Sequence, residues 1–398
     1  MIRRLTFLFA IILVSACGVR PEPARAAFQT QATAAYIYDV TNDTVLFEKN
    51  ANEPLPPASM SKLMTLYMLF NALRTGMKMP DGKPIELNSI FSVSTKAKSM
   101  GGSTMFLNEL DKPDVESLIK GIIVQSGNDA CVVVAEGLAG TEADFAKNMN
   151  TMAPQIGLTN STFTNSSGWP EPGHRMSMRD LGILATRLIT DFPEYYKYFA
   201  LEEYDFDSRA PANRFNRNPV LGLGLGADGL KTGHTEEAGY GLVGSAVQGD
   251  RRIVFVFTGL QTQADRRQEA EAMINWAFRQ FVEKNFAKAG HVVTEIPVWL
   301  GDHQSLNAVA ESDIRLLLPA IGGDTVETRV DYRRPLKAPI AAGDKVAELV
   351  VTAPDMPEKR IPLVADRDVV EGGFLPKVRA SAYVLFDKAM GQVQTLME

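Results

Sequence analysis

The segment Ser59-Met60-Ser61-Lys62 follows a proline-rich break at 54–57 and stands at the start of a predicted helix. Apolar residues recur at helical spacing after Lys62, which predicts one buried face. A serine and a lysine three positions apart share a helix face, so a neutral lysine amine can accept the serine's proton. The helix N-terminus beside Ser59 also suits an oxyanion. Alone, these four residues are more typical of a capping serine followed by a solvated lysine.

A second motif, Ser126-Gly127-Asn128, lies between two apolar helical runs. Gly127 is expected to break the helix there and to expose the two polar side chains on either side of it. Ser126 is suited to relaying a proton and Asn128 to binding a substrate amide. An ordinary turn between two helices has the same composition, so this motif is weak by itself.

A third motif, Lys231-Thr232-Gly233-His234, lies just ahead of a predicted strand at 240–247. The lysine supplies positive potential, and Thr232 supplies a hydroxyl donor for a carboxylate. Gly233 leaves room for an extended ligand along a strand edge. A turn carrying a surface lysine is the alternative interpretation.

The three motifs occur in the order Ser-x-x-Lys, Ser-x-Asn and Lys-Thr-Gly, a set shared by penicillin-binding proteins and class A β-lactamases. In particular, the chain resembles the low-molecular-mass penicillin-binding proteins that act as D-alanyl-D-alanine carboxypeptidases, serine peptidases of the penicillin-recognising superfamily. The resemblance covers residues 30–285 and rests on blocks at 57–62, 126–130 and 228–235, followed by Ala238-Gly239-Tyr240.

This resemblance implies a mechanism in which Ser59 attacks the carbonyl between two terminal D-alanines with Lys62 as the base. Water then hydrolyses the acyl-enzyme, and β-lactams act as covalent inhibitors. The backbone N–H groups of Ser59 and His234 are implied to form the oxyanion hole. The implied catalytic residues are Ser59, Lys62, Ser126, Asn128 and Lys231, and the implied substrate-binding residues are Thr232, Gly233, His234 and Arg217.

Some features depart from this pattern or are open to another interpretation. The glycine pair in the loop 101–106 is not expected in the family, so the role of that loop stays open. The glycines at 224, 226 and 229 match a dinucleotide fingerprint, but no βαβ unit surrounds them. The four histidines lack metal-ligand spacing, and neither a metal nor a cofactor is expected. The thiol of Cys131 lies in an apolar run and is expected to be buried.

The order of apolar runs, turn residues and helix caps along the chain predicts how it is divided into domains. The sequence predicts a hairpin at 34–49, helices capped by Asp114 and Ser177, a hairpin at 240–258 and a helix at about 264–286. Together with the resemblance, these elements indicate an α/β (α+β) domain of the β-lactamase/transpeptidase type, mainly an antiparallel sheet covered by helices. Five short β-type runs, at 292–298, 314–318, 325–330, 346–351 and 361–364, then predict a small β-rich C-terminal domain. The expected segments are a signal peptide at 1–26, a catalytic domain at 27–286, a β-rich domain at 287–375 and an amphipathic helix at 376–398.

The first 26 residues have the layout of a secretory signal peptide. Arg3 and Arg4 precede a 12-residue apolar core, and Ala24-Arg25-Ala26 is typical of a cleavage site. Val14-Ser15-Ala16-Cys17 also resembles a lipoprotein processing box, so lipidation at Cys17 is an alternative. Export is expected in either case, to a periplasmic location.

The net charge of the chain and the pattern of its last residues indicate which binding partners to expect. The chain carries a formal charge of −6, and residues 27–398 retain 37 basic and 46 acidic residues, so no nucleic-acid partner is expected. Residues 377–398 carry one apolar stripe at helical period, which is typical of a helix lying on the surface of the inner membrane. Packing of this helix on its own domain is the alternative. The expected ligands are the peptidoglycan stem peptide and β-lactam antibiotics.

Two other functions fit the motifs. A class A-like β-lactamase shares the three motifs but needs neither a β-rich domain nor a tail helix. A catalytically weak wall-binding protein does not need the intact Ser59, Lys62 and Lys231.

Overall fold

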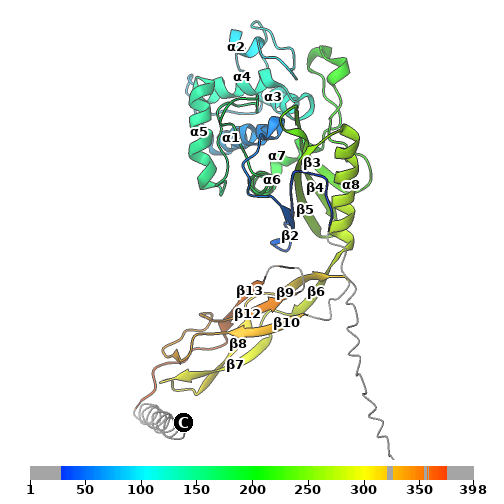
Figure 1. The fold of residues 1–398 in the computed structure, drawn as a ribbon. Helices are drawn as coiled ribbons and strands as arrows, with labels where there is room; N and C mark the ends of the chain where they lie inside the picture. Colours follow the sequence, from blue (N-terminus) through cyan, green and yellow to red (C-terminus); the bar gives the residue numbers. More distant parts are fainter. Residues whose placement is uncertain (1–27, 321–325, 354–355, 357, 374–398) are drawn as a thin grey trace, which may run out of the picture.

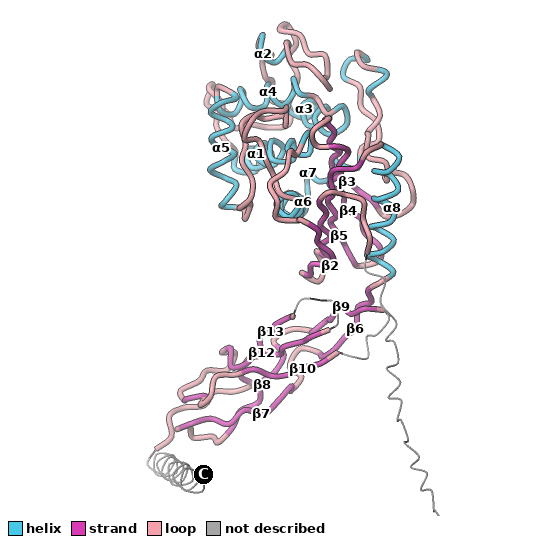
Figure 2. The backbone as a smooth tube through the Cα atoms, in the orientation of Figure 1, coloured by secondary structure: helices cyan, strands magenta, loops and turns pink. Residues whose placement is uncertain are grey.

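The computed structural model describes residues 28–320, 326–353, 356 and 358–373 of the chain. They form a larger domain of sheet and helices and an elongated β-rich domain (Figures 1 and 2). The predicted signal peptide at 1–26 and the predicted tail helix at 376–398 lie outside the described residues.

The larger domain is built on a five-stranded antiparallel sheet in the order β2-β1-β5-β4-β3. Its strands are β1 (Ala34–Asp39), β2 (Thr44–Lys49), β3 (Ala227–Thr235), β4 (Gly239–Gln248) and β5 (Arg251–Leu260). Both predicted hairpins are confirmed. The third motif forms part of β3 itself, which the sequence did not predict as a strand, and β3 is an edge strand of the sheet.

Helices cover both faces of this sheet (Figure 1). One face packs on α8 (Gln263–Arg279), which buries a cluster around Phe255 and Phe257. The other face packs on a helical layer whose core includes Phe70, Phe145 and Phe192. That layer contains α1 (Lys62–Thr75), α2 (Thr95–Lys98), α3 (Val115–Lys120), α4 (Asn128–Ala139), α5 (Glu142–Gln155), α6 (Met178–Asp191) and α7 (Pro193–Tyr196).

Local sequence explains where several helices begin. The side chain of Asp114 accepts the N–H of Ser117 at the start of α3, and Ser177 accepts that of Asp180 at the start of α6, so both predicted caps are confirmed. A capping box fixes the start of α8. Cys131 is fully buried in α4, and burial raises the pKa of its thiol to about 12. The expectation of a small buried hydrophobe is therefore confirmed.

The predicted helix at 264–286 is too long. Helix α8 ends at Arg279, and Phe281–Ala287 forms strand β6, which pairs with β9 (Ile314–Pro319). The chain therefore enters the β-rich part six residues earlier than expected. Helical spacing of apolar residues cannot reveal this end, because the pairing partner of β6 lies about thirty residues further along the chain.

The rest of the β-rich part is a six-stranded sheet in the order β10-β12-β13-β8-β7-β11. Its strands are β7 (Val292–Trp299), β8 (Ser305–Ala310), β10 (Glu327–Asp331), β11 (Leu336–Lys337), β12 (Lys345–Thr352) and β13 (Lys359–Ala365). Strand β11 runs parallel to β7, and the other pairs are antiparallel. The five predicted β runs are confirmed, whereas β6, β8 and β11 were not predicted.

Candidate active site

The side chains of Ser59 and Lys62 meet where the short helical turn Ala58–Ser61 leads into α1. The Lys62 Nζ lies 2.9 Å from the Ser59 Oγ, 2.7 Å from the Asn128 Oδ1 and 2.6 Å from the backbone oxygen of Ser167. Lys62 is fully buried, whereas Ser59 is half-buried. The predicted contact between serine and lysine is therefore present.

The surroundings of Lys62 favour its neutral form. All three hydrogen-bond partners of its nitrogen are uncharged, and burial lowers the pKa of the ammonium to about 8. A base is most effective when its pKa lies near the working pH. Lys62 therefore has both the contact and the lowered pKa that a base for the Ser59 hydroxyl would need.

The second motif breaks the helical path as expected, but the prediction that the break exposes Ser126 and Asn128 is wrong, because both side chains are buried. A π-helical turn, Gly121–Gln125, ends at Ser126, whose backbone is left-handed at φ 59°, and α4 begins at Asn128. The hydroxyl of Ser126 is buried and has no hydrogen-bond partner among the described residues. A strained backbone and an unpaired buried hydroxyl at one residue are typical of a functional position.

The loop 101–106 forms hydrogen bonds with this motif. The Asn128 Nδ2 donates to the backbone oxygen of Gly101 at 2.8 Å, and the Asn128 N–H donates to that of Ser103 at 2.7 Å. A Cβ added at Gly102, where φ is +73°, would lie 3.1 Å from the Asn128 Nδ2 and 3.1 Å from the Trp169 ring. Close approach and a left-handed backbone thus explain the second glycine of the pair, Gly102.

Strand β3 brings the third motif against the nucleophile segment. A Cβ added at Gly233 would lie 3.0 Å from the backbone oxygen of Pro57 and 3.0 Å from the Met60 Cγ, so a side chain there would crowd the nucleophile segment. Lys231 is buried, and its ammonium donates to the backbone oxygen of Thr232 at 3.1 Å. Burial, together with the positive charge of Arg217, holds the pKa of Lys231 well below its usual value.

Arg217 lies at the same site. Its guanidinium donates to the Ser103 Oγ at 3.1 Å and to the backbone oxygen of Gln125 at 2.8 Å. Burial lowers the pKa of this side chain. Both acceptors are neutral, so the positive charge of Arg217 is left for another group.

Sequence analysis missed Arg266, in the first turn of α8. It is 3% exposed, donates to the backbone oxygen of Arg217 at 3.3 Å and lies over the Tyr240 ring. Burial, with the charge of Arg217, lowers its pKa to about 10. The only sequence signal was the capping box that begins at Thr262.

Lys62, Lys231, Arg217 and Arg266 form a group of four basic side chains, three of them buried and Arg217 partly buried, which we call the cationic cluster. Within the described part of the chain, no carboxylate forms an ion pair with any of them. Buried charges without an opposite charge are costly to maintain. The cluster therefore leaves positive potential beside Ser59 that no carboxylate of the described residues balances.

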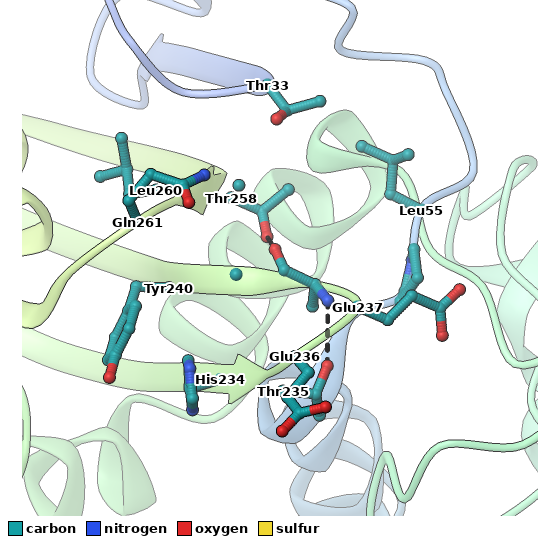
Figure 3. Close-up of a pocket in the computed structure, with 14 residues that line it drawn as sticks. Thr33, Leu55, His234, Thr235, Glu236, Glu237, Tyr240, Thr258, Leu260 and Gln261 are labelled. Atoms are coloured by element: carbon teal, nitrogen blue, oxygen red, sulfur yellow. Dashed lines mark hydrogen bonds between the residues drawn. The ribbon is translucent and has the colours of Figure 1, made fainter.

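His234 ends the motif on β3 with an exposed side chain that stacks on Tyr240, at 3.9 Å between ring centroids (Figure 3). Hydrogen bonds thus connect Ser59, Lys62 and Asn128, and Ser103 connects Asn128 to Arg217. The charge of Lys231 interacts with those of Lys62 and Arg217, and Ser126 lies two positions before Asn128 with an unpaired hydroxyl. Gly233 packs on the nucleophile segment, and Thr232 and His234 flank Gly233 on the same strand.

A second residue that sequence analysis missed is His174. It is buried, its Nε2 lies 2.7 Å from the Ser61 Oγ, and its Nδ1 accepts the N–H of Thr164 at 3.2 Å. A lone histidine carries little signal in a sequence, because its partners here lie 113 and 10 residues away.

The fold and the site define a serine-type acyl-transfer enzyme of the penicillin-binding class. Comparison with known families supports this class over almost the whole chain. Residues 20–262 match the family model described as D-alanyl-D-alanine carboxypeptidase, and residues 281–371 match that of the C-terminal domain of penicillin-binding protein 5. The chain belongs to the D-alanyl-D-alanine carboxypeptidase family.

Individual relatives agree. The chain is 34% identical over 381 residues to the D-alanyl-D-alanine carboxypeptidase DacC of Escherichia coli, covering 94% of this chain and 91% of the relative. It is 32% identical to DacF of Bacillus subtilis, covering 87% of each chain. The crystal structure of penicillin-binding protein 5 from Haemophilus influenzae superposes with a TM-score of 0.74 at 30% identity, covering 87% of this chain and 100% of that one.

Proposed function

We propose that Ser59 is the nucleophile of a D-alanyl-D-alanine carboxypeptidase that removes the terminal D-alanine from peptidoglycan stem pentapeptides. The Ser59 Oγ attacks the carbonyl between the two D-alanines while Lys62 takes the hydroxyl proton. The C–N bond then breaks, and the proton passes through Ser126 to the leaving amine. Water hydrolyses the ester and regenerates Ser59. The observation that carries this proposal is the 2.9 Å contact between the Lys62 Nζ and the Ser59 Oγ inside the cationic cluster.

The cationic cluster supports recognition of a free C-terminal carboxylate. We assign this role to Arg217, whose planar fork suits two carboxylate oxygens, together with Thr232 and Lys231. Arg266 adds positive potential behind Arg217. Asn128 is assigned to the substrate amide, and Gly233 gives the peptide access to the edge of β3. The backbone N–H groups of Ser59 and His234 are assigned to the oxyanion.

The same chemistry accounts for inhibition by β-lactams. A β-lactam presents a strained amide and a carboxylate to the same groups, and Ser59 opens the ring to form an ester. A penicillin-binding protein of Listeria monocytogenes, whose structure was solved in an ampicillin-bound form, is 28% identical to this chain, with a TM-score of 0.56. The match of residues 281–371 to a penicillin-binding protein's C-terminal domain favours the carboxypeptidase over a β-lactamase.

Labelled penicillin, followed over time, tests the proposal. A carboxypeptidase forms a slowly hydrolysed adduct on Ser59, a β-lactamase turns the drug over rapidly, and a silent wall protein forms no adduct. Release of D-alanine from a D-Ala-D-Ala peptide by wild type, and its loss in Ser59→Ala, completes the test.

We also propose the remaining organisation of the chain. The boundary between the catalytic and β-rich domains is placed at 280/281, since β6 begins at Phe281 and a separate family model begins there. Residues 1–26 are proposed as a signal peptide cleaved near Ala26, with lipidation at Cys17 as the alternative, so that the enzyme acts in the periplasm. Removal of Cys17 together with N-terminal sequencing of the exported protein decides between the two.

Residues 377–398 are proposed to attach the enzyme to the outer face of the inner membrane through their apolar stripe. Among the described residues, no helix has the length and apolar character needed to span a bilayer. Deleting residues 377–398 should move the protein from the membrane fraction to the soluble fraction, and unchanged fractionation would contradict the proposal.

A further inference from the structure

A buried carboxylate, that of Glu142, lies at the first residue of α5. Its side chain is 7% exposed, and its Oε2 pairs with the Nζ of Lys96, in α2, at 2.7 Å. Its Oε1 accepts the backbone N–H of Ser166 at 3.0 Å and the Ser166 hydroxyl at 2.6 Å. Burial by itself would raise the pKa of Glu142, but the hydrogen bonds from Lys96 and Ser166 outweigh it and hold this pKa below its usual value. Glu142 is therefore ionised at neutral pH, with no role in the mechanism proposed above.

The residue that Glu142 binds, Ser166, is held at both ends of its backbone. Glu142 accepts its N–H and its hydroxyl, and its backbone oxygen accepts the hydroxyl of Thr65, in α1, at 2.5 Å. Two residues further on, a Cβ added at Gly168 would lie 1.9 Å from the backbone oxygen of Ala58. The chain at Ser166 thus packs tightly against the turn that carries the nucleophile, and it has little freedom to shift relative to α1.

The next carbonyl along this chain, that of Ser167, lies against the proposed base. Its oxygen is 2.6 Å from the Lys62 Nζ, and the Asn128 Oδ1 is 2.7 Å from the same nitrogen. A neutral amine has two N–H donors and one lone pair, whereas these two oxygens can only accept hydrogen bonds. They therefore take both N–H groups, which leaves the lone pair for the third neighbour of the nitrogen, the Ser59 hydroxyl at 2.9 Å.

We propose that Glu142 is a positioning residue for acylation. By holding Ser166, it places the next carbonyl so that the lone pair of Lys62 points toward Ser59. This inference rests on the proposed role of Lys62 as the base. It requires the reach of the Glu142 side chain more than its charge, because the two donors of Ser166 need an acceptor at that place.

Two variants separate length from charge, with the acylation rate constant for benzylpenicillin as the readout. Glu142→Gln keeps the length and an acceptor oxygen for Ser166, and Lys96, whose side chain is 55% exposed, can turn to water. This variant should stay within about threefold of wild type, since a partly exposed ion pair contributes little. Glu142→Asp keeps the charge but is one methylene shorter, so it should slow acylation about tenfold, the order expected when one hydrogen bond of the base is lost.

The binding step and a matched control show where the effect arises. The dissociation constant of the non-covalent penicillin complex should stay within about twofold of wild type in both variants, because Glu142 acts on the base and not on the ligand. Asp144→Asn removes an exposed carboxylate from the same turn of α5, where it pairs with Lys147, and should keep the wild-type rate. The rate constant is measured on the molecules that become acylated, so unfolded protein does not lower it.

The pH dependence of acylation is a further readout that a loss of folded protein would not change. Because the Ser167 carbonyl also stabilises the ammonium form of Lys62, its displacement in Glu142→Asp should move the acid limb of the rate to lower pH. The other titratable groups around Lys62 are the same in all variants, namely Cys131, Arg217, Asp129, Lys231 and His174.

Three results would overturn the inference: a wild-type rate in Glu142→Asp, a slowing in Glu142→Gln that equals or exceeds that in Glu142→Asp, or an effect confined to the dissociation constant. The same assay separates the inference from the proposed function. If benzylpenicillin does not acylate Ser59 in wild type, the proposed function itself fails. If Ser59 is acylated and the two variants do not differ in this way, only the role of Glu142 fails.

Discussion

The Nε2 of His174 lies 2.7 Å from the Oγ of Ser61, the residue between Met60 and Lys62 in the nucleophile segment. Because the Nδ1 accepts the N–H of Thr164, the ring is the neutral tautomer that donates to Ser61. Burial lowers the pKa of His174 to about 4, which keeps it neutral at working pH. A neutral histidine thus fixes the position of the segment that carries Ser59.

His174→Gln is expected to retain most of the acylation rate, because an amide can accept from Thr164 and donate to Ser61. His174→Phe keeps the bulk but leaves polar groups unpaired, and it should cost about 1–3 kcal/mol of unfolding free energy and slow acylation. Urea unfolding and penicillin acylation rates measure both effects. Equal behaviour of the two variants would contradict the positioning role.

The pH dependence of stability provides a further readout of His174. Because its folded-state pKa is lowered from 6.5 to about 4, the unfolded state binds more protons between these values. Wild type should therefore lose stability as pH falls from 6.5 to 4, and His174→Gln should lose less over this window. Parallel stability curves for the two proteins would show that the ring is protonated in the folded state.

The base assigned to Ser59 predicts how activity depends on pH. With the pKa of Lys62 lowered to about 8, the neutral amine becomes about tenfold rarer for each pH unit below that value. The acylation rate with benzylpenicillin, measured by stopped flow, should fall accordingly from pH 8 to pH 6. A rate that stays level between these values would remove Lys62 as the base.

Replacing Arg217 tests the carboxylate site. Arg217→Gln should lower kcat/KM about 10- to 100-fold for a peptide with a free C-terminal carboxylate, the range expected for a charged hydrogen bond of about 1.5–3 kcal/mol. It should have little effect on a peptide amide, which lacks the charge. Arg267→Gln removes a nearby exposed arginine that pairs with Glu271 and serves as the matched control. An equal loss on both peptides would point to a structural role instead.

Gly102→Ala isolates the close approach of the loop to Asn128. Both Gly102 and Gly82 have a positive φ, at +73° and +81°, but a Cβ at Gly82 meets nothing within 4 Å. Gly82→Ala therefore costs only backbone strain, about 1 kcal/mol. Gly102→Ala should cost more and should also slow acylation, since Asn128 must move. Thermal unfolding and acylation assays compare the two variants, and identical effects would show that crowding at Asn128 is unimportant.

The three motifs could be found in the sequence, because each one combines a chemically distinctive residue with nearby signals for a helix or a turn. It did not reveal the cationic cluster in full. Arg266 becomes part of the site only because α8 packs beside Arg217, and His174 only because two distant segments meet. The requirement for glycine at 102 is likewise visible only in the structure, where Trp169 and Asn128 pack against it. Local sequence patterns predict helices, strands and turns, whereas contacts such as those of Arg266 and His174 depend on packing between segments that are far apart in the sequence.

The most direct measurement is mass mapping of the covalent adduct after a short exposure to benzylpenicillin. In wild type, the adduct should lie on the peptide that contains Ser59. Ser61→Ala, which removes the neighbouring hydroxyl, should still be labelled at Ser59. Ser59→Ala should carry no adduct and should release no D-alanine from a D-Ala-D-Ala peptide. An adduct at another residue, or D-alanine release by Ser59→Ala, would contradict the account.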